Sequence, residues 1–316
     1  MEEIRSLRET LRPWLVETPV VRCRNLEERL GNDIEIWGKL EFLQQTGTFK
    51  PRGALANMLR LDEAGLRAGV TAVSAGNHAI ATAFAARALG TSAKVVMIRT
   101  ASSVRVEACR GYGAEVVLAD DVHQAFDLAD RIRDAEGRAL IHPFEGSYVT
   151  AGTATLGLEI CEQLSNFDAV IVPIGGGGLC SGVACAVKRL NPGCRVIGVE
   201  PAGADSMSRS FASGRPRRLD HVDTIADSLG APFALPYSFS ICRQFVDDIV
   251  IVSDDQLRSA MGTLFGDMKM AVEPACAAST AALAGTGRGL RGKKVVLVFC
   301  GSNIDWMTFE QHAGFS

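Results

Sequence analysis

Hydrophobic residues along this chain fall into two patterns that alternate from about residue 70 to residue 300. Short runs of Val, Ile and Ala alternate with longer Ala- and Leu-rich segments, such as residues 77–90, that have helical spacing. Short apolar runs flanked by helices are typical of parallel strands that are buried on both faces. The predicted strands cover residues 71–75, 93–98, 114–119, 139–143, 168–174, 195–200, 248–253 and 293–300.

This alternation predicts an α/β fold with two domains, because 316 residues are enough for two modest units. We expect two three-layer α/β/α domains with mostly parallel sheets. Residues 50–145 would form a small, mobile domain, and residues 1–49 and 146–316 a large one. Such sheets bind ligands beyond the carboxyl ends of their strands. The turns that follow the predicted strands are therefore the first places to search for chemistry.

Composition and charge narrow the possible partners. The chain is 22% charged with a formal net charge of −3 and has no dense basic run, so no nucleic-acid partner is expected. The N-terminus is charged and amphipathic, and no apolar stretch is long enough for a membrane span, so neither secretion nor a membrane partner is expected. Nine scattered cysteines without paired spacing indicate reduced thiols and a cytoplasmic location.

The stretch "QTGTFKPRGA" (44–53) places a lysine, Lys50, between Phe49 and Pro51. Proline suits the first turn of a helix, and Thr48 is a suitable N-cap, so Lys50 is predicted at a fixed corner between a loop and a helix. A lysine held at such a corner is a candidate nucleophile. A lysine without chemistry at a helix entrance is the commoner case.

The turn "SAGNHA" (74–79) follows the first predicted strand and precedes a helical segment. The first amides of that helix, together with Ser74, Asn77 and His78, form a candidate carboxylate site. A small-residue turn capped by an asparagine is the structural alternative.

Four consecutive glycines follow the predicted strand at 168–174 and open another helix. Glycines let backbone amides approach a phosphate closely, and the helix dipole favours the anion. A dinucleotide-binding site is the alternative. Its fingerprint needs an acidic residue about 20 residues after the glycines, and Glu200 lies at roughly that distance along the chain. Four glycines in a row are unusual for that site, so phosphate is favoured. The glycines are Gly175, Gly176, Gly177 and Gly178.

The last predicted strand ends at Cys300, in front of another Gly/Ser/Asn turn. A buried, inert thiol is the structural alternative for this position. Together, the strand ends supply a lysine, a carboxylate turn, a phosphate loop and a small polar residue. Those are the parts needed to hold pyridoxal phosphate (PLP) and an amino acid.

The motifs "TGTFKPRGA", "SAGNHA" and "GGGGL" resemble those of the fold type II PLP enzymes, which have the tryptophan synthase β-like fold. The resemblance is to the threonine/serine dehydratase and serine racemase group within them. Four further segments resemble blocks of that group in the same order, so the resemblance covers nearly the whole chain. They are "VEPAGADS" (199–206), "TIADSLG" (224–230), "VEPACAA" (272–278) and "FCGSNID" (299–305).

The resemblance implies a role for each of these positions. Lys50 would be the catalytic residue: it would carry PLP as a Schiff base, and its freed amine would remove the substrate's α-proton. Phe49 would pack on the pyridine ring, Asn77 would bond the 3′-oxygen, and Cys300 would face the ring nitrogen. Gly175, Gly176, Gly177, Gly178 and Leu179 would hold the phosphate, and Ser74, Ala75, Gly76, Asn77 and His78 the substrate carboxylate.

By the same resemblance, the large domain would bind the cofactor and the small domain would lie on the substrate side. The reaction would be that of a PLP-dependent lyase converting a β-hydroxy L-amino acid, threonine or serine in the first place, to a 2-oxo acid and ammonia. The Cys300 thiol is a weak donor, which leaves the ring nitrogen unprotonated and suits elimination better than transamination. A homodimer or other homo-oligomer is expected.

Two positions depart from the family pattern. Racemases similar to this chain have a serine base where Ala75 stands, so two-base racemisation loses one base. Glu200 and Ala204 match a divalent-metal site, but Ser206 replaces its second carboxylate, which leaves Mg²⁺ or Ca²⁺ binding open.

Four alternatives therefore stay open. They are an amino-acid racemase, a 3-hydroxyaspartate dehydratase with an unidentified cationic partner, a dinucleotide-dependent oxidoreductase, and a PLP-binding protein without turnover.

Overall fold

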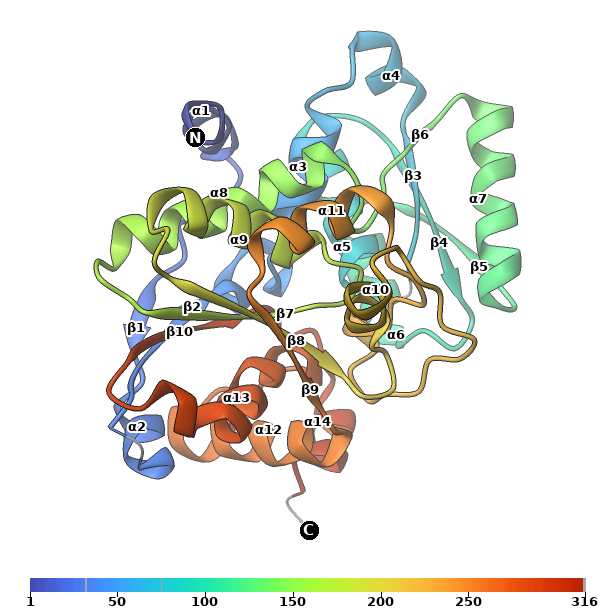
Figure 1. Cartoon of the computed structure of the whole chain (residues 1–316). Helices are drawn as coiled ribbons and strands as arrows, with labels where there is room; N and C mark the ends of the chain where they lie inside the picture. The colour runs from blue at the N-terminus through green and yellow to red at the C-terminus, as the bar shows by residue number, and fades with distance from the viewer. Residues whose placement is uncertain (32, 75, 315–316) are drawn as a thin grey trace.

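The computed structural model describes residues 1–31, 33–74 and 76–314, and its strands form two separate sheets (Figure 1). The six-stranded sheet is parallel except for its edge strand β1. The four-stranded sheet is parallel throughout. In spatial order the strands are β1 (Val20–Arg22), β2 (Glu35–Leu40), β10 (Lys294–Phe299), β7 (Ala169–Pro173), β8 (Arg195–Pro201) and β9 (Asp248–Val252), and then β5 (Glu115–Ala119), β4 (Ala93–Ile98), β3 (Val70–Val73) and β6 (Ala139–Leu140).

Helices cover both faces of the six-stranded sheet, as Figure 1 shows. One side carries α8 (Ser147–Gln163), α9 (Gly178–Leu190) and α11 (Pro236–Phe245), and α1 (Glu2–Leu11) and α3 (Lys50–Met58) lie against α8. The other side carries α2 (Arg24–Leu30), α12 (Asp254–Met268), α13 (Pro274–Thr286) and α14 (Trp306–Ala313). Helix α10 (Ser206–Ser213) follows β8, and short 3₁₀ turns are η1 (Glu41–Leu43), η2 (Gln45–Gly47), η3 (Asp227–Leu229) and η4 (Gly287–Leu290).

The smaller sheet is also a sandwich between helices. Helices α5 (Asn77–Ala88) and α6 (Ser103–Gly111) lie on one face and α7 (Val122–Glu136) on the other, with α4 (Glu63–Ala68) leading into β3. Buried residues form one cluster around the large sheet and two on the faces of the small one. The predicted three-layer α/β/α class with mostly parallel sheets is confirmed. The division at residues 50 and 145, and the mobility of the small unit, remain predictions.

The strand predictions fail in instructive places. Strands β1 and β2 were not predicted, because β2 contains charged residues at Glu35 and Lys39 within an otherwise apolar segment. The run at 139–143 forms only the two-residue strand β6. Helix α3 begins at Lys50 with Phe49 as its N-cap, so the prediction that Thr48 is the N-cap was wrong. The Thr48 hydroxyl nevertheless accepts a hydrogen bond from the Lys50 amide at 3.3 Å.

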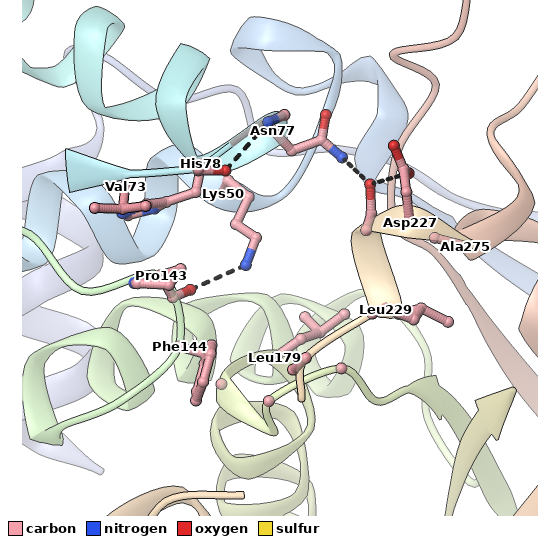
Figure 2. A pocket seen from close by; sticks show the side chains of 18 of the residues that line it. Lys50, Val73, Asn77, His78, Pro143, Phe144, Leu179, Asp227, Leu229 and Ala275 are labelled. Carbon is pink, nitrogen blue, oxygen red and sulfur yellow. Dashed lines mark hydrogen bonds between the residues drawn. The ribbon is translucent and has the colours of Figure 1, made fainter. Parts of the chain in front are cut away.

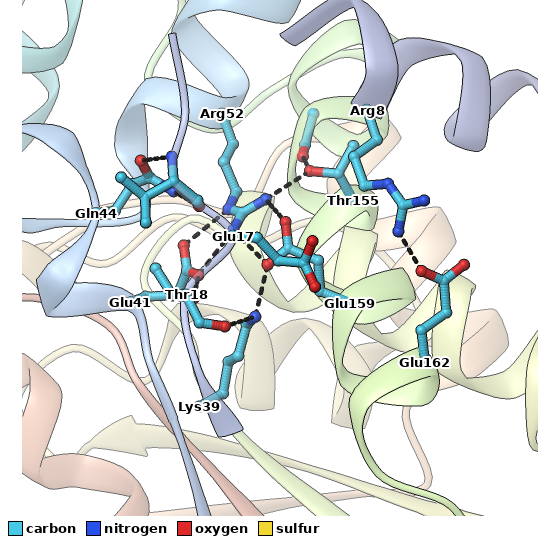
Figure 3. A network of polar contacts seen from close by, with 12 residues as sticks. Arg8, Glu17, Thr18, Lys39, Glu41, Gln44, Arg52, Thr155, Glu159 and Glu162 are labelled. Carbon is cyan, nitrogen blue, oxygen red and sulfur yellow. Dashed lines mark hydrogen bonds and ion pairs between the residues drawn. The ribbon is translucent and has the colours of Figure 1, made fainter. Parts of the chain in front are cut away.

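A buried network of charges joins β2, α3 and α8 (Figure 3). The Arg52 guanidinium donates to both oxygens of Glu41, at 2.8 and 2.9 Å, and to both of Glu159, at 2.6 and 2.8 Å. The Lys39 amine donates to Glu159 and to the Thr18 carbonyl. Each of these four charged side chains is at most 3% exposed, so the charges are tolerated only because they are paired.

No helix among the described residues has the length and apolarity needed to cross a bilayer.

Candidate active site

A cavity of about 280 Å³ lies between the two sheets, beyond the carboxyl ends of β3, β7 and β10. This is the place that the strand-end rule predicts for a ligand in open α/β sheets. Its lining includes every described residue that sequence reasoning assigned to the cofactor or to the substrate carboxylate. These are Phe49, Lys50, Ser74, Gly76, Asn77, His78, Gly175, Gly176, Gly177, Gly178, Leu179 and Cys300. Ala75 lies outside the described residues.

Lys50 reaches into this cavity from the first turn of α3 (Figure 2). Its amine donates to the Pro143 carbonyl at 2.9 Å and lies 4.9 Å from the centre of the Phe49 ring. Burial lowers the pKa of Lys50 to about 8, although Cys300 and Glu273 act in the opposite direction. A fraction of the amine is therefore neutral near pH 7, which is the form that attacks a carbonyl carbon.

The glycine loop between β7 and α9 is tightly packed and needs its glycines. Gly177 has φ of +94°, and a Cβ there would lie 2.7 Å from Cε of Met207. A Cβ on Gly176 would overlap the Phe144 ring at 2.3 Å, and one on Gly178 would lie 2.7 Å from the Phe144 backbone. The loop therefore presents bare backbone at the start of a 13-residue helix, an arrangement that suits a phosphate dianion.

Asn77 is held by polar groups from the other side of the cavity, as Figure 2 shows in part. Its amide nitrogen donates to Glu273 Oε1 at 2.8 Å and to Ser228 Oγ at 3.1 Å, and its oxygen accepts from Asn303 at 2.8 Å. Burial, followed by the charge of Asp227, raises the pKa of Glu273 to about 7. The Asn77 amide is thus fixed with a donor group directed toward the large sheet.

Cys300 directly follows β10, lines the cavity together with Lys50 and is 3% exposed. Its neighbour Cys276, and then burial, raise the pKa of the Cys300 thiol far above its usual range. The thiol therefore stays protonated and is at best a weak donor to a ring nitrogen.

The carboxylate turn is described at Ser74 and from Gly76 onward. The Gly76 amide donates to Ser74 Oγ at 3.2 Å, and α5 begins at Asn77 without a side-chain cap. His78 is buried with Nε2 2.8 Å from the Ile141 carbonyl, and burial lowers its pKa to about 3. The His78 ring is neutral and bonded to the backbone, so His78 can bind an anion only through its backbone amide.

Sequence reasoning gave no role to several residues that line the cavity. Glu273 lies in the quoted segment "VEPACAA" and Asp227 in "TIADSLG", where a carboxylate in an apolar or turn segment was the available signal. The third charged residue, Arg105, is on α6 and had no such signal. Aromatic side chains also line the cavity, namely Phe126, Phe144 and Phe233.

Glu200 and Ala204 do not line this cavity. Both carboxylate oxygens of Glu200 accept backbone amides at the start of α10, from Met207 at 2.8 Å and Ser208 at 2.7 Å. Glu200 therefore caps a helix and is not free for a ribose hydroxyl, which removes the argument for a dinucleotide site. Within residues 1–31, 33–74 and 76–314, no group of three His, Cys, Asp or Glu side chains could hold a metal ion.

Comparisons with known proteins agree with this geometry. The family model described as pyridoxal-phosphate dependent enzyme matches residues 11–301. The chain is 53% identical to a phenylserine dehydratase of Ralstonia pickettii, over 99% of this chain and 96% of that protein. It is 38% identical to the catabolic L-threonine dehydratase of Escherichia coli K12, over 100% and 96% of the two chains.

Among solved structures, maize serine racemase superimposes with a TM-score of 0.92 at 34% identity, covering 98% of this chain and 95% of that one. The strand-end geometry, the family match and the level of identity lead to one conclusion. The chain belongs to the fold type II pyridoxal-phosphate dependent enzymes, in the group of threonine, serine and phenylserine dehydratases and serine racemases.

Proposed function

We propose that this enzyme is a PLP-dependent dehydratase that converts a β-hydroxy L-amino acid with an aryl side chain to a 2-oxo acid and ammonia. The observation that carries this proposal is a partly buried lysine without a salt bridge among the described residues, facing an apolar cavity wall. That wall includes Val73, Ile98, Phe126 and Phe233. The similarity to the Ralstonia phenylserine dehydratase supports an aryl substrate over the smaller threonine and serine.

The residues present fit the cofactor. When bound, PLP supplies an electron sink that weakens the bond between the α-carbon and its hydrogen. Lys50 would hold it covalently and, once released, move the α-proton with its amine. The glycine loop would bind the phosphate. The Asn77 amide, whose two hydrogens go to Glu273 and Ser228, would exchange one of these bonds for a bond to a ring oxygen.

Phe49 and Cys300 line the same cavity as Lys50. The Phe49 ring lies beside the Lys50 amine and would pack on the cofactor ring. The protonated thiol of Cys300 would leave the ring nitrogen without a strong acid, a setting that favours loss of the β-hydroxyl over a long-lived carbanion. The amides at Gly76, Asn77 and His78, with Ser74, would receive the substrate carboxylate.

Dehydration is favoured over racemisation by the alanine at position 75. The alanine side chain has no group that can accept or donate a proton, so the second base that related racemases have as a serine at this position is missing. The wild-type enzyme should therefore form 2-oxo acid with very little D-amino acid. Ala75→Ser should raise racemisation relative to elimination, although by less than the ~10²-fold of a well-supported base.

The test is a substrate panel with the PLP-loaded enzyme. L-threo-phenylserine, L-threonine, L-serine and both 3-hydroxyaspartate diastereomers are assayed for 2-oxo acid, and the residual substrate is analysed on a chiral column. Highest turnover of phenylserine, and a lower ratio of phenylserine to threonine turnover in Phe233→Ala, would support the proposal. Turnover of threonine alone would refute the aryl specificity, and abundant D-amino acid would refute the dehydratase.

A divalent cation at Glu200 and Ala204 remains a prediction. The Ser206 hydroxyl is buried without a hydrogen-bond partner among the described residues, which favours a missing ligand there. Against it, the Glu200 oxygens cap α10 and Asp205 is paired with Arg209 at 2.8 Å. Metal analysis of the purified enzyme before and after chelation decides whether a cation is bound there. The homo-oligomeric state and the cytoplasmic location likewise remain predictions.

A further inference from the structure

Arg105, on α6, lines the catalytic cavity and contacts two loops of the large sheet, at Asp227 and Asn303. Its side chain is 12% exposed. The guanidinium donates through Nη1 to Asp227 Oδ2 and through Nη2 to Asp227 Oδ1 at 3.3 Å. Nη2 also donates to the Asn303 carbonyl at 3.1 Å and lies 4.0 Å from Glu273.

The guanidinium lies directly against the carboxylate turn. A Cβ built on Gly76 would be 3.0 Å from Nη1 of Arg105 and 3.4 Å from its Cζ. Helix α5 begins at the next residue with its first amides uncapped by a side chain. A full positive charge and a set of backbone donors therefore converge on one spot in the cavity, which is the arrangement that binds a carboxylate most strongly.

The other basic groups near this turn do not supply that charge. His78 is neutral, because burial lowers its pKa to about 3. The Lys50 amine is committed to the cofactor in the working enzyme. Arg105 cannot lose its proton, so its charge persists at every pH at which the protein is folded.

We propose, on the basis of the function proposed above, that Arg105 is the cation that recognises the α-carboxylate of the substrate. Asp227 holds the Arg105 guanidinium in place before the substrate binds. The substrate carboxylate then accepts hydrogen bonds from the same guanidinium. Asp227 is 55% exposed, so water stabilises its charge when the arginine turns toward the substrate. Arg105 thereby sets the selectivity for amino acids over amines and amides.

The test compares two ligands that lack a β-hydroxyl and so bind without turnover. PLP-loaded enzyme is titrated with L-phenylalanine and with L-phenylalaninamide, and the cofactor's visible absorbance reports binding. Arg105→Gln should weaken L-phenylalanine about 10- to 100-fold, the usual range for loss of a charge-assisted hydrogen bond. The amide should change much less. Arg99→Gln is the matched control, because Arg99 is an exposed residue paired with Asp120.

The Asp227→Asn variant separates carboxylate recognition from a structural role. If Arg105 recognises the carboxylate, Asp227→Asn should leave L-phenylalanine binding unchanged or tighter. If Arg105 only ties α6 to the η3 turn, both variants should weaken both ligands in parallel, and the proposal is wrong. It is also wrong if Arg105→Gln abolishes turnover of 3-hydroxyaspartate while sparing L-phenylalanine, since Arg105 would then serve a second carboxylate.

The Arg105→Lys variant and the PLP absorbance of the wild type distinguish failure of the Arg105 proposal from failure of the proposed function. If Arg105→Gln fails to retain PLP, Arg105→Lys and Asp227→Asn provide the comparison, and the lysine variant should keep part of the preference for L-phenylalanine over its amide. Complete loss of that preference in Arg105→Lys would contradict the proposal, because lysine keeps the positive charge. A wild-type enzyme without PLP absorbance would refute the proposed function itself, independently of Arg105.

Discussion

Lys50 and Arg52 leave the first turn of α3 only two residues apart, yet they enter opposite surroundings. Arg52 points into the buried network of Figure 3, where two carboxylates take up its donors. Lys50 points into the cavity of Figure 2, where its hydrogen bond goes to a backbone carbonyl and no carboxylate among the described residues forms a salt bridge with it. Arg52 is fully buried and Lys50 partly buried, and of these two described side chains only Arg52 is paired with carboxylates.

Pairing decides what each cation can do. The carboxylates of Glu41 and Glu159 offset the burial of Arg52 and raise its pKa, so this residue is a permanent charge that anchors the helix. The unpaired Lys50 responds to burial by losing affinity for its proton. One helix turn thus combines a fixed structural charge with an amine prepared for chemistry, and the anchor fixes the position of the amine.

The largest expected effect comes from removing the unpaired cation. Lys50→Ala should reduce turnover by more than about 10⁴-fold, because in the proposed function this one group would both carry the cofactor and move the proton. Circular dichroism and the melting temperature of the cofactor-free variant should stay close to those of the cofactor-free wild type. Borohydride reduction and peptide mapping should place the pyridoxyl group on Lys50 in the wild type. Labelling of Lys39 or Lys94 would contradict the assignment, and Lys94→Ala serves as the control.

Breaking the ion pairs of Arg52 should lower the stability of the fold rather than turnover. Arg52→Met leaves Glu41 buried without its cation, which typically costs about 3–5 kcal/mol in the free energy of unfolding. Urea denaturation of the cofactor-free protein measures this loss. Arg67→Met, which removes an exposed pair with Glu63, should change little. A fully stable Arg52→Met protein would show that the pairing of Arg52 is not what holds this turn.

The pH dependence of cofactor capture reports directly on the unpaired amine. Because the pKa of Lys50 is lowered to about 8, the neutral amine grows as the pH rises through 8 and is complete above it. The rate of PLP capture by the cofactor-free protein should therefore rise about tenfold per pH unit below 8 and level off above it. Stopped-flow absorbance measures the rate. A midpoint near 10.4, as for an exposed lysine, would contradict the lowered pKa.

Lys39→Met should have the smallest effect, because Arg52 still donates hydrogen bonds to both glutamates when Lys39 is gone. The expected loss in the free energy of unfolding is about 1.5–3 kcal/mol, the range for one hydrogen bond to a charged group. A double-mutant cycle with Arg52→Met gives the coupling between the two cations. If Lys39→Met is as damaging as Arg52→Met, the network depends on all its members equally and the arginine is not its centre.

Much of the fold and part of the site could be predicted from local sequence. Glycine runs, a Lys-Pro corner and apolar runs each state a local constraint on the backbone, so Lys50 and Gly177 were found as candidates without tertiary information. Strand β2 was missed because the partner of Lys39 is Glu159, 120 residues away. Arg105 was missed for the same reason, since its place in the cavity depends on Asp227 and Asn303 from the other sheet's loops.

The division of the hydrophobic core between the two sheets has a consequence for folding cooperativity. Each sheet has its own buried clusters, so each can in principle open as a separate unit with its own free energy. The cavity lies on the seam, with lining residues from both sides. A ligand that contacts both sides binds only the state in which both are folded, and mass action then stabilises the two units together. The cofactor would therefore link the two units thermodynamically in addition to its role in the reaction.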